Sequence, residues 1–221
     1  MSIYTDVVYR NYPKSQYPEK LARYLKDNYF LKSKSNLLEI GYGEGEYLNL
    51  FWEMDIRAYG VDKKSDTVNP MFERYCDLEK DNIPYPEDFF DYIYTKSMIE
   101  HVTNTDRLLK EAKRVLKTGG KIVILTPAWE FNYKDFYNDY TQTKPFHRKG
   151  LREALMITGF KDVKVDYFYH LPFMWNRPYL QFIPKILSMF YLWKWKDKEE
   201  TIHRPLIRFS QEVQLIATAI K

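Results

Sequence analysis

Three glycines within five residues, placed directly after a short apolar run, limit most strongly what this chain can fold into. The apolar run at residues 37–40 is predicted to be a strand, and Gly41, Gly43 and Gly45 follow it before a helical pattern. Glycine lets the backbone turn tightly and approach a ligand closely, and the N–H groups of such a turn point toward that ligand. Only eight glycines occur in 221 residues, so their concentration here predicts a nucleotide-type binding loop.

The spacing of these glycines argues against two common phosphate-binding loops. The segment reads Gly-Tyr-Gly-Glu-Gly, whereas a dinucleotide loop needs G-x-G-x-x-G and a P-loop needs a following Gly-Lys-Ser/Thr. Glu39 precedes the loop, and Glu44 and Glu46 lie within it or just after it. Carboxylates are poor neighbours for a pyrophosphate and acceptable ones for a cation, so the loop suits a positively charged ligand better.

Strand and helix patterns alternate along most of the chain. Further strands are predicted over residues 57–61, 72–76, 91–95, 121–126 and 213–219, and helices over residues 18–30 and 106–117. We expect Gly119 and Gly120 to end the second helix. This order is typical of βαβ units and a mostly parallel sheet, so the fold class is α/β. The period-two pattern of the last strand predicts a place at or near the sheet edge, and the sheet is expected to pause between residues 128 and 210.

Carboxylates end the second and third predicted strands. Asp62 lies about 20 residues after the start of the loop, where a ribose diol could be held, and Asp77 ends the next strand. Residues 90–102 read Phe-Asp-Tyr-Ile-Tyr-Thr-Lys-Ser-Met-Ile-Glu-His-Val. Together with the glycine loop and the later glycine pair, this ordered set resembles the class I S-adenosylmethionine-dependent methyltransferases. The resemblance covers residues 36–126 and is similar to the small-molecule subgroup that carries Glu-His-Val.

That resemblance implies a fold, a cofactor and a site. The implied fold is a Rossmann-like sheet of seven mostly parallel strands flanked by helices, with an aromatic helical insertion or cap before the last strand. It implies one methyltransferase domain over residues 1–221, with a cofactor-binding core at 36–126 and acceptor-side insertions and the cap at 128–208. The implied cofactor is S-adenosylmethionine, with S-adenosylhomocysteine as product. Its binding residues would be Gly41, Gly43, Gly45 and Glu39 at the methionine part, Asp62 at the ribose, Asp77 and Leu78 at the adenine, and Ser97 and Met98 at the reaction centre. Tyr42 departs from the small residue that many relatives carry there.

Several acceptor classes are disfavoured by the sequence. Enzymes that methylate exocyclic amines of bases have Asn/Asp-Pro-Pro-Tyr/Phe after the fourth strand, where this chain has Thr95-Lys96-Ser97. Attack on ring C5 of a pyrimidine needs a cysteine nucleophile, and the one cysteine, Cys76, precedes the adenine-side Asp77. A formal net charge of +4 with scattered lysines is too mild to indicate a nucleic-acid partner.

Polar residues after the fourth and fifth strands are the acceptor-side candidates. His101 could act as a general base or could pin a helix start by hydrogen bonding. Asp139, Tyr140 and His147 lie in a stretch that resembles the acceptor segment of bacterial methyltransferases for surface sugars and other small molecules. His170 and His203 lack supporting neighbours. No metal site is predicted, because the carboxylates and amides of residues 132–139 would have to converge on one cation.

A dense aromatic run follows residue 170, with a helix predicted over residues 186–195 after Pro184. Three interpretations of the segment from Tyr179 to Trp195 stay open: a cap over the acceptor pocket, a homodimer interface, or a peripheral membrane helix. No uninterrupted apolar run reaches the roughly 18 residues of a spanning helix. The single cysteine and the absence of a signal sequence suit a cytoplasmic location, with or without peripheral membrane contact.

The sequence therefore predicts a methyltransferase that uses S-adenosylmethionine and acts on a small-molecule acceptor. O-methylation of a sugar or glycoconjugate precursor is the first expectation. The alternatives are a lipid, quinone or other membrane-borne acceptor, and a cofactor-binding scaffold without catalysis.

Overall fold

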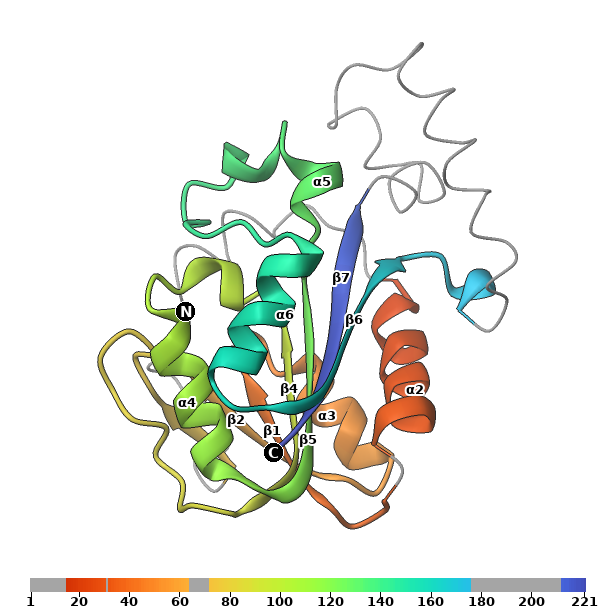
Figure 1. The fold of residues 1–221 in the computed structure, drawn as a ribbon. Coiled ribbons are helices and arrows are strands. Elements are labelled where there is room, and N and C mark those ends of the chain that lie inside the picture. The colour runs from red at the N-terminus through yellow and green to blue at the C-terminus, as the bar shows by residue number, and fades with distance from the viewer. Residues whose placement is uncertain (1–14, 31, 64–71, 176–211) are drawn as a thin grey trace.

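A layered α/β arrangement positions the predicted loop at one end of a central sheet (Figure 1). The computed structural model describes residues 15–30, 32–63, 72–175 and 212–221. Among them, seven strands form one sheet in the order β3-β2-β1-β4-β5-β7-β6. The strands are β1 (Asn36–Ile40), β2 (Arg57–Asp62), β3 (Glu73–Tyr75), β4 (Phe90–Lys96), β5 (Leu116–Pro127), β6 (Lys161–Tyr169) and β7 (Val213–Ile220).

Strands β1 to β5 run parallel, and only β7 pairs antiparallel, with β5 on one side and β6 on the other. The central strands are apolar and buried on both faces, as parallel strands between two helical layers must be. The expected Rossmann-like sheet of seven mostly parallel strands is confirmed. Because parallel strands share one carboxyl edge, the segments that follow β1, β2 and β4 meet there.

Two helical layers cover the sheet (Figure 1). One face carries α2 (Tyr17–Tyr29) and α3 (Glu46–Glu53), and the other carries α4 (Thr105–Val115) and α6 (Arg148–Ile157). Asn104 caps α4 by accepting the backbone N–H of Arg107, as residues of its type do at helix starts. Gly159, with φ +85°, ends α6 in the left-handed conformation that glycine adopts readily. No helix within the described ranges is long and apolar enough to cross a membrane.

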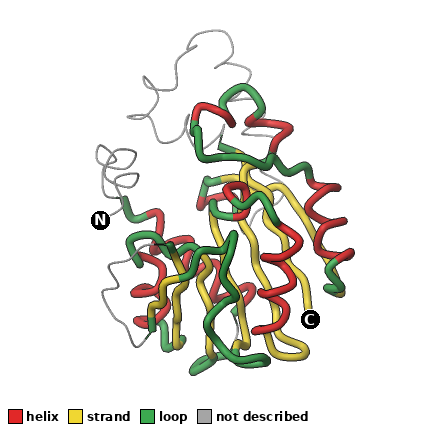
Figure 2. The backbone as a smooth tube through the Cα atoms, turned by 90° about the vertical axis from the view of Figure 1, so that its left-hand side faces the viewer, coloured by secondary structure: helices red, strands yellow, loops and turns green. Residues whose placement is uncertain are grey.

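Short helices follow the parallel strands at their carboxyl edge. After β4 comes η1 (Ile99–His101), and after β5 come α5 (Trp129–Asn132) and η2 (Phe136–Asn138). In Figure 2 the strands lie side by side, and the segment with α5 and η2 lies beyond one end of them. A further turn, η3 (Pro172–Met174), follows β6. The acceptor-side candidates therefore gather at the edge where the glycine loop lies.

Two sequence predictions need correction. The second predicted helix ends at Val115 rather than at residue 117, because Leu116 is fully buried and already pairs with Phe90 in β5. The predicted glycine pair lies in the bulge that follows, where the register moves on to Lys121 opposite Tyr92. The sheet also does not pause throughout residues 128–210, because β6 lies there and forms the edge strand.

The final strand is confirmed, one place inside that edge. Strands β5 and β6 flank β7, and most of its residues are buried. The period-two pattern of this strand therefore does not reflect a face exposed to solvent. The predicted aromatic helix at residues 186–195 and the segment from Tyr179 to Trp195 lie outside the described residues.

Candidate functional site

The glycine loop turns sharply between β1 and α3. Gly41, Gly43 and Gly45 all have positive φ values, of +77°, +54° and +75°. A Cβ atom on Gly41 would lie 2.6 Å from Cγ of Met98, the residue that follows β4 closely. Such a distance is shorter than any real contact, so a side chain at Gly41 would push the loop away from the β4 end. The loop is thus in direct contact with the segment predicted to line the reaction centre.

Tyr42, the departure from the usual small residue, points away from this contact. Its ring lies where a Cβ on Gly60 would be, 2.6 Å from the Tyr42 Cδ1 atom, and Tyr42 belongs to the core under α2 and α3. Gly60, in the middle of β2, therefore provides the space for the larger residue. The aromatic ring fills the sheet face instead of the space above the loop.

Glu39 is a buried carboxylate just before the loop. Only 3% of its surface is exposed, and Oε2 has no hydrogen-bond partner among the residues that the structure describes. Burial raises the pKa of Glu39 well above its ordinary value, against the opposing positive charge of Lys96. A buried, unsatisfied carboxylate oxygen is costly for a fold, and it fits a ligand that brings a positively charged donor.

Asp62 ends β2, and Asp77 follows the end of the neighbouring β3 by two residues, where the Cys76 N–H donates to the Asp62 carbonyl at 2.8 Å. Asp62 Oδ2 accepts the N–H of Gly43 at 2.9 Å, which ties the loop to the end of β2. Lys63, the next residue, pairs with Asp77 Oδ2 at 3.2 Å. Burial alone would raise the pKa of Asp77, but the hydrogen bonds and charges of Lys63, the Glu79 N–H and Lys80 outweigh it and hold the pKa below the ordinary value. Leu78 beside it is buried.

The end of β4 carries a strained residue. Ser97 has φ +51°, a conformation that non-glycine residues adopt rarely and that occurs preferentially at functional sites. Its N–H donates to the Leu125 carbonyl at 2.9 Å, and its Oγ accepts from Gln214 Nε2 at 3.2 Å. Strands β5 and β7 therefore hold Ser97 in place from the side opposite the glycine loop.

Lys96, at the end of β4, and the buried Glu100 influence each other electrostatically, and the sequence reasoning did not single them out. Desolvation lowers the pKa of Lys96, although the carboxylates of Glu100, Glu212 and Glu39 act in the opposite direction. Glu100 is fully buried, and Thr126 Oγ1 donates to its Oε2 at 2.9 Å. Burial shifts the pKa of Glu100 in the opposite direction from that of Lys96 and raises it. The sequence signal that could have pointed to these two residues is a lysine and a glutamate four positions apart, on either side of the end of a predicted strand.

His101 and Asp139 are brought together by a residue that lies between them. The His101 Nδ1 atom is 2.9 Å from Thr141 Oγ1, and Thr141 Oγ1 donates to Asp139 Oδ1 at 2.7 Å. Thr141 carried no sequence signal, because a threonine in a loop is usually a turn residue. Tyr140 lies in the same loop but is 85% exposed.

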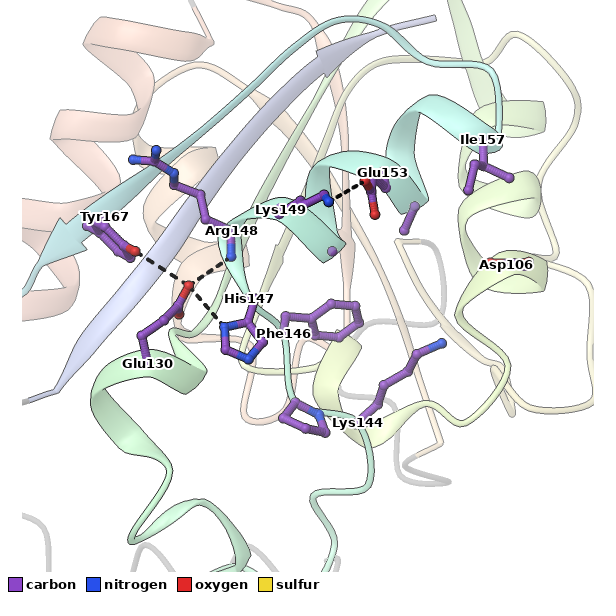
Figure 3. Close-up of a pocket in the computed structure, with 13 residues that line it drawn as sticks. Asp106, Glu130, Lys144, Phe146, His147, Arg148, Lys149, Glu153, Ile157 and Tyr167 are labelled. Carbon is purple, nitrogen blue, oxygen red and sulfur yellow. Dashed lines mark hydrogen bonds and ion pairs between the residues drawn. The ribbon is translucent and has the colours of Figure 1, made fainter.

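His147 belongs to a different place, a pocket of about 800 Å³ around the start of α6 (Figure 3). Its Nδ1 atom is 3.2 Å from Glu130 Oε1, which also accepts the N–H of Arg148 at 3.2 Å and the hydroxyl of Tyr167 at 3.4 Å. Figure 3 shows the His147 and Tyr167 side chains and the backbone nitrogen of Arg148 around the Glu130 carboxylate. The pocket borders the His101 segment through Lys144, whose N–H donates to the Glu100 carbonyl. The acceptor-side candidates thus fall into two groups.

Two other predicted features have structural partners. His170 is 5% exposed and hydrogen-bonds to the hydroxyl of Tyr17 on α2, so it does have a supporting neighbour. Asn132 donates to the carbonyls of Ala128 and Val213, which anchors α5 to β7. Within the described ranges, no group of three or more His, Cys, Asp or Glu side chains is arranged to hold a metal ion.

Comparisons with known proteins identify the family of this chain. A family model described as a methyltransferase domain matches residues 9–165. Phosphoethanolamine N-methyltransferase 2 of Caenorhabditis elegans is 24% identical over 150 residues, which are 61% of this chain and 34% of that protein. The ubiquinone/menaquinone biosynthesis C-methyltransferase of Bordetella avium is 31% identical over 103 residues, or 40% of each chain.

The structure of a SAM-dependent methyltransferase from Archaeoglobus fulgidus has a TM-score of 0.65 at 23% identity, covering 99% of this chain and 98% of that one. At this identity the structural likeness shows the fold alone. The matched region spans well under half the length of each of the two curated methyltransferases named above. The family match covers more than half of the chain. The chain therefore belongs to the methyltransferase domain family and has the fold of the class I S-adenosylmethionine-dependent enzymes.

Proposed function

We propose that this protein transfers the methyl group of S-adenosylmethionine to a hydroxyl group of a small acceptor, with a sugar or glycoconjugate precursor as the favoured class. One observation carries the proposal. A single sheet edge brings together a glycine loop, a buried carboxylate with an oxygen that no described residue hydrogen-bonds, and a histidine in the turn after β4 that is held by a hydrogen bond. The first two features fit a cationic cofactor, and the third fits proton removal from a neutral hydroxyl.

The residues of the loop edge would hold the cofactor. The buried Glu39 carboxylate would pair with its amino group, Asp62 would accept from the ribose hydroxyls, and Asp77 with Leu78 would border the adenine. S-adenosylmethionine supplies a methyl group already activated by a sulfonium, whose carbon–sulfur electron pair stays on sulfur when the methyl leaves. The protein therefore has to orient the acceptor and remove one proton.

His101 is the proposed base. It follows β4 by five residues, and the strained Ser97 and Met98 lie between the strand and η1. Residues 128–208 are proposed to shape the acceptor side of the same domain. A hydroxyl acceptor needs a base because its proton is not lost spontaneously near neutral pH, whereas an amine or a stabilised carbanion makes other demands.

A second candidate acceptor, one carried by a lipid, is favoured by exposed aromatic side chains near α5 and η2. Phe131, Tyr133 and Tyr137 are 46%, 53% and 60% exposed, and Tyr140 is more exposed still. Aromatic side chains of this kind suit a membrane interface, and they also suit stacking on a sugar ring. One curated relative is named as a phosphoethanolamine N-methyltransferase, and another as a C-methyltransferase of ubiquinone/menaquinone biosynthesis.

A labelled methyl-transfer screen tests the proposed function. Purified protein is incubated with methyl-labelled S-adenosylmethionine and with separate aqueous and lipid extracts of the source cells, and the labelled product is identified. We expect an oxygen-methylated, water-soluble product, with Glu53→Ala, an exposed change on α3, as a fully active control. A labelled lipid would support the second acceptor. Cofactor binding without transfer to any extract would leave a non-catalytic scaffold.

The buried carboxylate makes cofactor affinity depend on pH. Because burial raises the pKa of Glu39, the free protein holds this side chain protonated at pH values where an exposed glutamate is ionised. A cationic amino group favours the ionised form of Glu39, so we expect cofactor binding to release a proton. We also expect the affinity for the cofactor to fall as the pH is lowered from about 8 toward about 5, a range that lies above the ordinary pKa of glutamate. Calorimetry in buffers of different ionisation enthalpy measures both effects.

The matched variant for this measurement is Glu39→Gln, which keeps the shape and removes the charge. It should bind the cofactor more weakly at pH 8 and show little change across the same range. If wild-type affinity were flat between pH 5 and pH 8, the pairing of Glu39 with the cofactor would be wrong.

A further inference from the structure

The loop that carries Asp139 and Thr141 is fastened to the turn that carries His101. The backbone N–H groups of Thr143 and Lys144 both donate to the carbonyl of Glu100, at 2.9 and 3.0 Å. The carboxylate of Glu100 is in turn held by Thr126 at the end of β5. Thr141 therefore meets the histidine ring as part of a fixed arrangement rather than as a free loop side chain.

The hydrogen bonds of Thr141 determine where the ring proton of His101 lies. A threonine hydroxyl has one proton to donate, and an ionised carboxylate can only accept. Thr141 Oγ1 lies 2.7 Å from Asp139 Oδ1, to which it donates, and the Thr141 N–H donates to the same oxygen at 3.0 Å. At 2.9 Å from His101 Nδ1 the hydroxyl must then accept. The neutral ring consequently carries its proton on Nδ1 and a lone pair on Nε2.

We propose that Thr141 and Asp139 are positioning residues that hold His101 in this tautomer, which makes Nε2 the proton-accepting atom. The inference rests on the proposed function, in which His101 is the base. The acceptor hydroxyl gives its proton to Nε2 and keeps the electron pair of the O–H bond for the new bond to carbon. The imidazolium that results keeps its Nδ1–H bond to Thr141, whose own hydrogen bond to Asp139 is unchanged.

The test is the tautomer itself, read from the nitrogen-15 shifts of the histidine rings in the whole protein at a pH where the His101 ring is neutral. His101→Asn removes one set of signals and so assigns them. We expect the wild-type ring to carry its proton on Nδ1. Thr141→Ser should keep that state, whereas Thr141→Val, of equal size but without a hydroxyl, should lose it. In Asp139→Ala the freed threonine proton can turn to Nδ1, so the ring proton should move to Nε2.

The inference would be overturned by a wild-type ring protonated on Nε2, or by a ring that keeps its proton on Nδ1 in both Thr141→Val and Asp139→Ala. The tautomer is measured without an acceptor, so this outcome is separate from any failure to find methyl transfer. Once an acceptor is known, Thr141→Val should lower kcat by about 10-fold or more with the cofactor Kd unchanged, and Thr141→Ser should restore it. Full turnover of His101→Asn with the expected tautomer in wild type would contradict the proposed base and its positioning role together. Melting curves identify any variant that fails to fold. If Thr141→Val does not fold, the tautomers of Thr141→Ser and Asp139→Ala decide whether the inference holds.

Discussion

Replacing His101 by asparagine is expected to lower kcat by about 100-fold or more, which is the usual contribution of a general base. The asparagine amide nitrogen takes the place of Nδ1 and can still donate to Thr141 Oγ1, so the hydrogen bond that spans 2.9 Å in the wild type is replaced by an equivalent one. Only the Nε2 position is lost. Calorimetry with S-adenosylmethionine should give the wild-type Kd, and single-turnover kinetics should show that the methyl-transfer step has slowed.

This comparison also separates the two groups of acceptor-side residues. His147, in the pocket of Figure 3, is paired with Glu130 rather than with Thr141. If His147→Asn abolished turnover while His101→Asn did not, the base would lie at the start of α6 and the proposed chemistry would move to that pocket. Glu53→Ala, far from either group in the sequence and exposed on α3, controls for general loss of active protein.

Asp62→Ala should weaken cofactor binding by a similar factor. Two hydrogen bonds from ribose hydroxyls to a carboxylate contribute roughly 3 kcal/mol together, which corresponds to about 100-fold in Kd. The variant also removes the acceptor of the Gly43 N–H at the centre of the loop. Calorimetric titration with S-adenosylmethionine and with S-adenosylhomocysteine measures the loss, which should be equal for both because they share the ribose.

Asp62→Asn distinguishes the two contributions. Its amide oxygen can still accept the Gly43 N–H, so the loop stays in place while the negative charge disappears. We expect an intermediate affinity for this variant and an unchanged one for Glu53→Ala. Wild-type affinity in Asp62→Ala would show that the carboxylate supports the loop only, and that the ribose is held elsewhere.

Much of the cofactor edge could be predicted from local sequence, because the features that mark it are local. The glycine spacing reflects three positive φ values, and apolar runs ending in Glu39 or Asp62 mark strands with acidic tips. The sequential strand–helix alternation then places the carboxyl ends of β1, β2 and β4 at one edge. No long-range contact had to be known for those steps.

The acceptor side was harder to predict because its contacts join segments that are distant in sequence. His101 and Thr141 are 40 residues apart and meet only when the loop after β5 folds back onto η1. The edge strand β6 was missed, since its alternating charges and aromatics resemble a surface loop until β7 pairs with it.

The amino-acid sequence by itself thus specifies a loop suited to a cationic ligand and the carboxylates around it, because backbone torsions and strand ends depend on neighbouring residues. Three-dimensional packing was needed to show that Gly60 makes room for Tyr42, that Glu39 has a buried oxygen without a hydrogen bond from the described part of the chain, and that His147 stands apart from His101. Those properties come from burial and from hydrogen bonds between distant segments, and such bonds exist only after the sheet has brought the segments together.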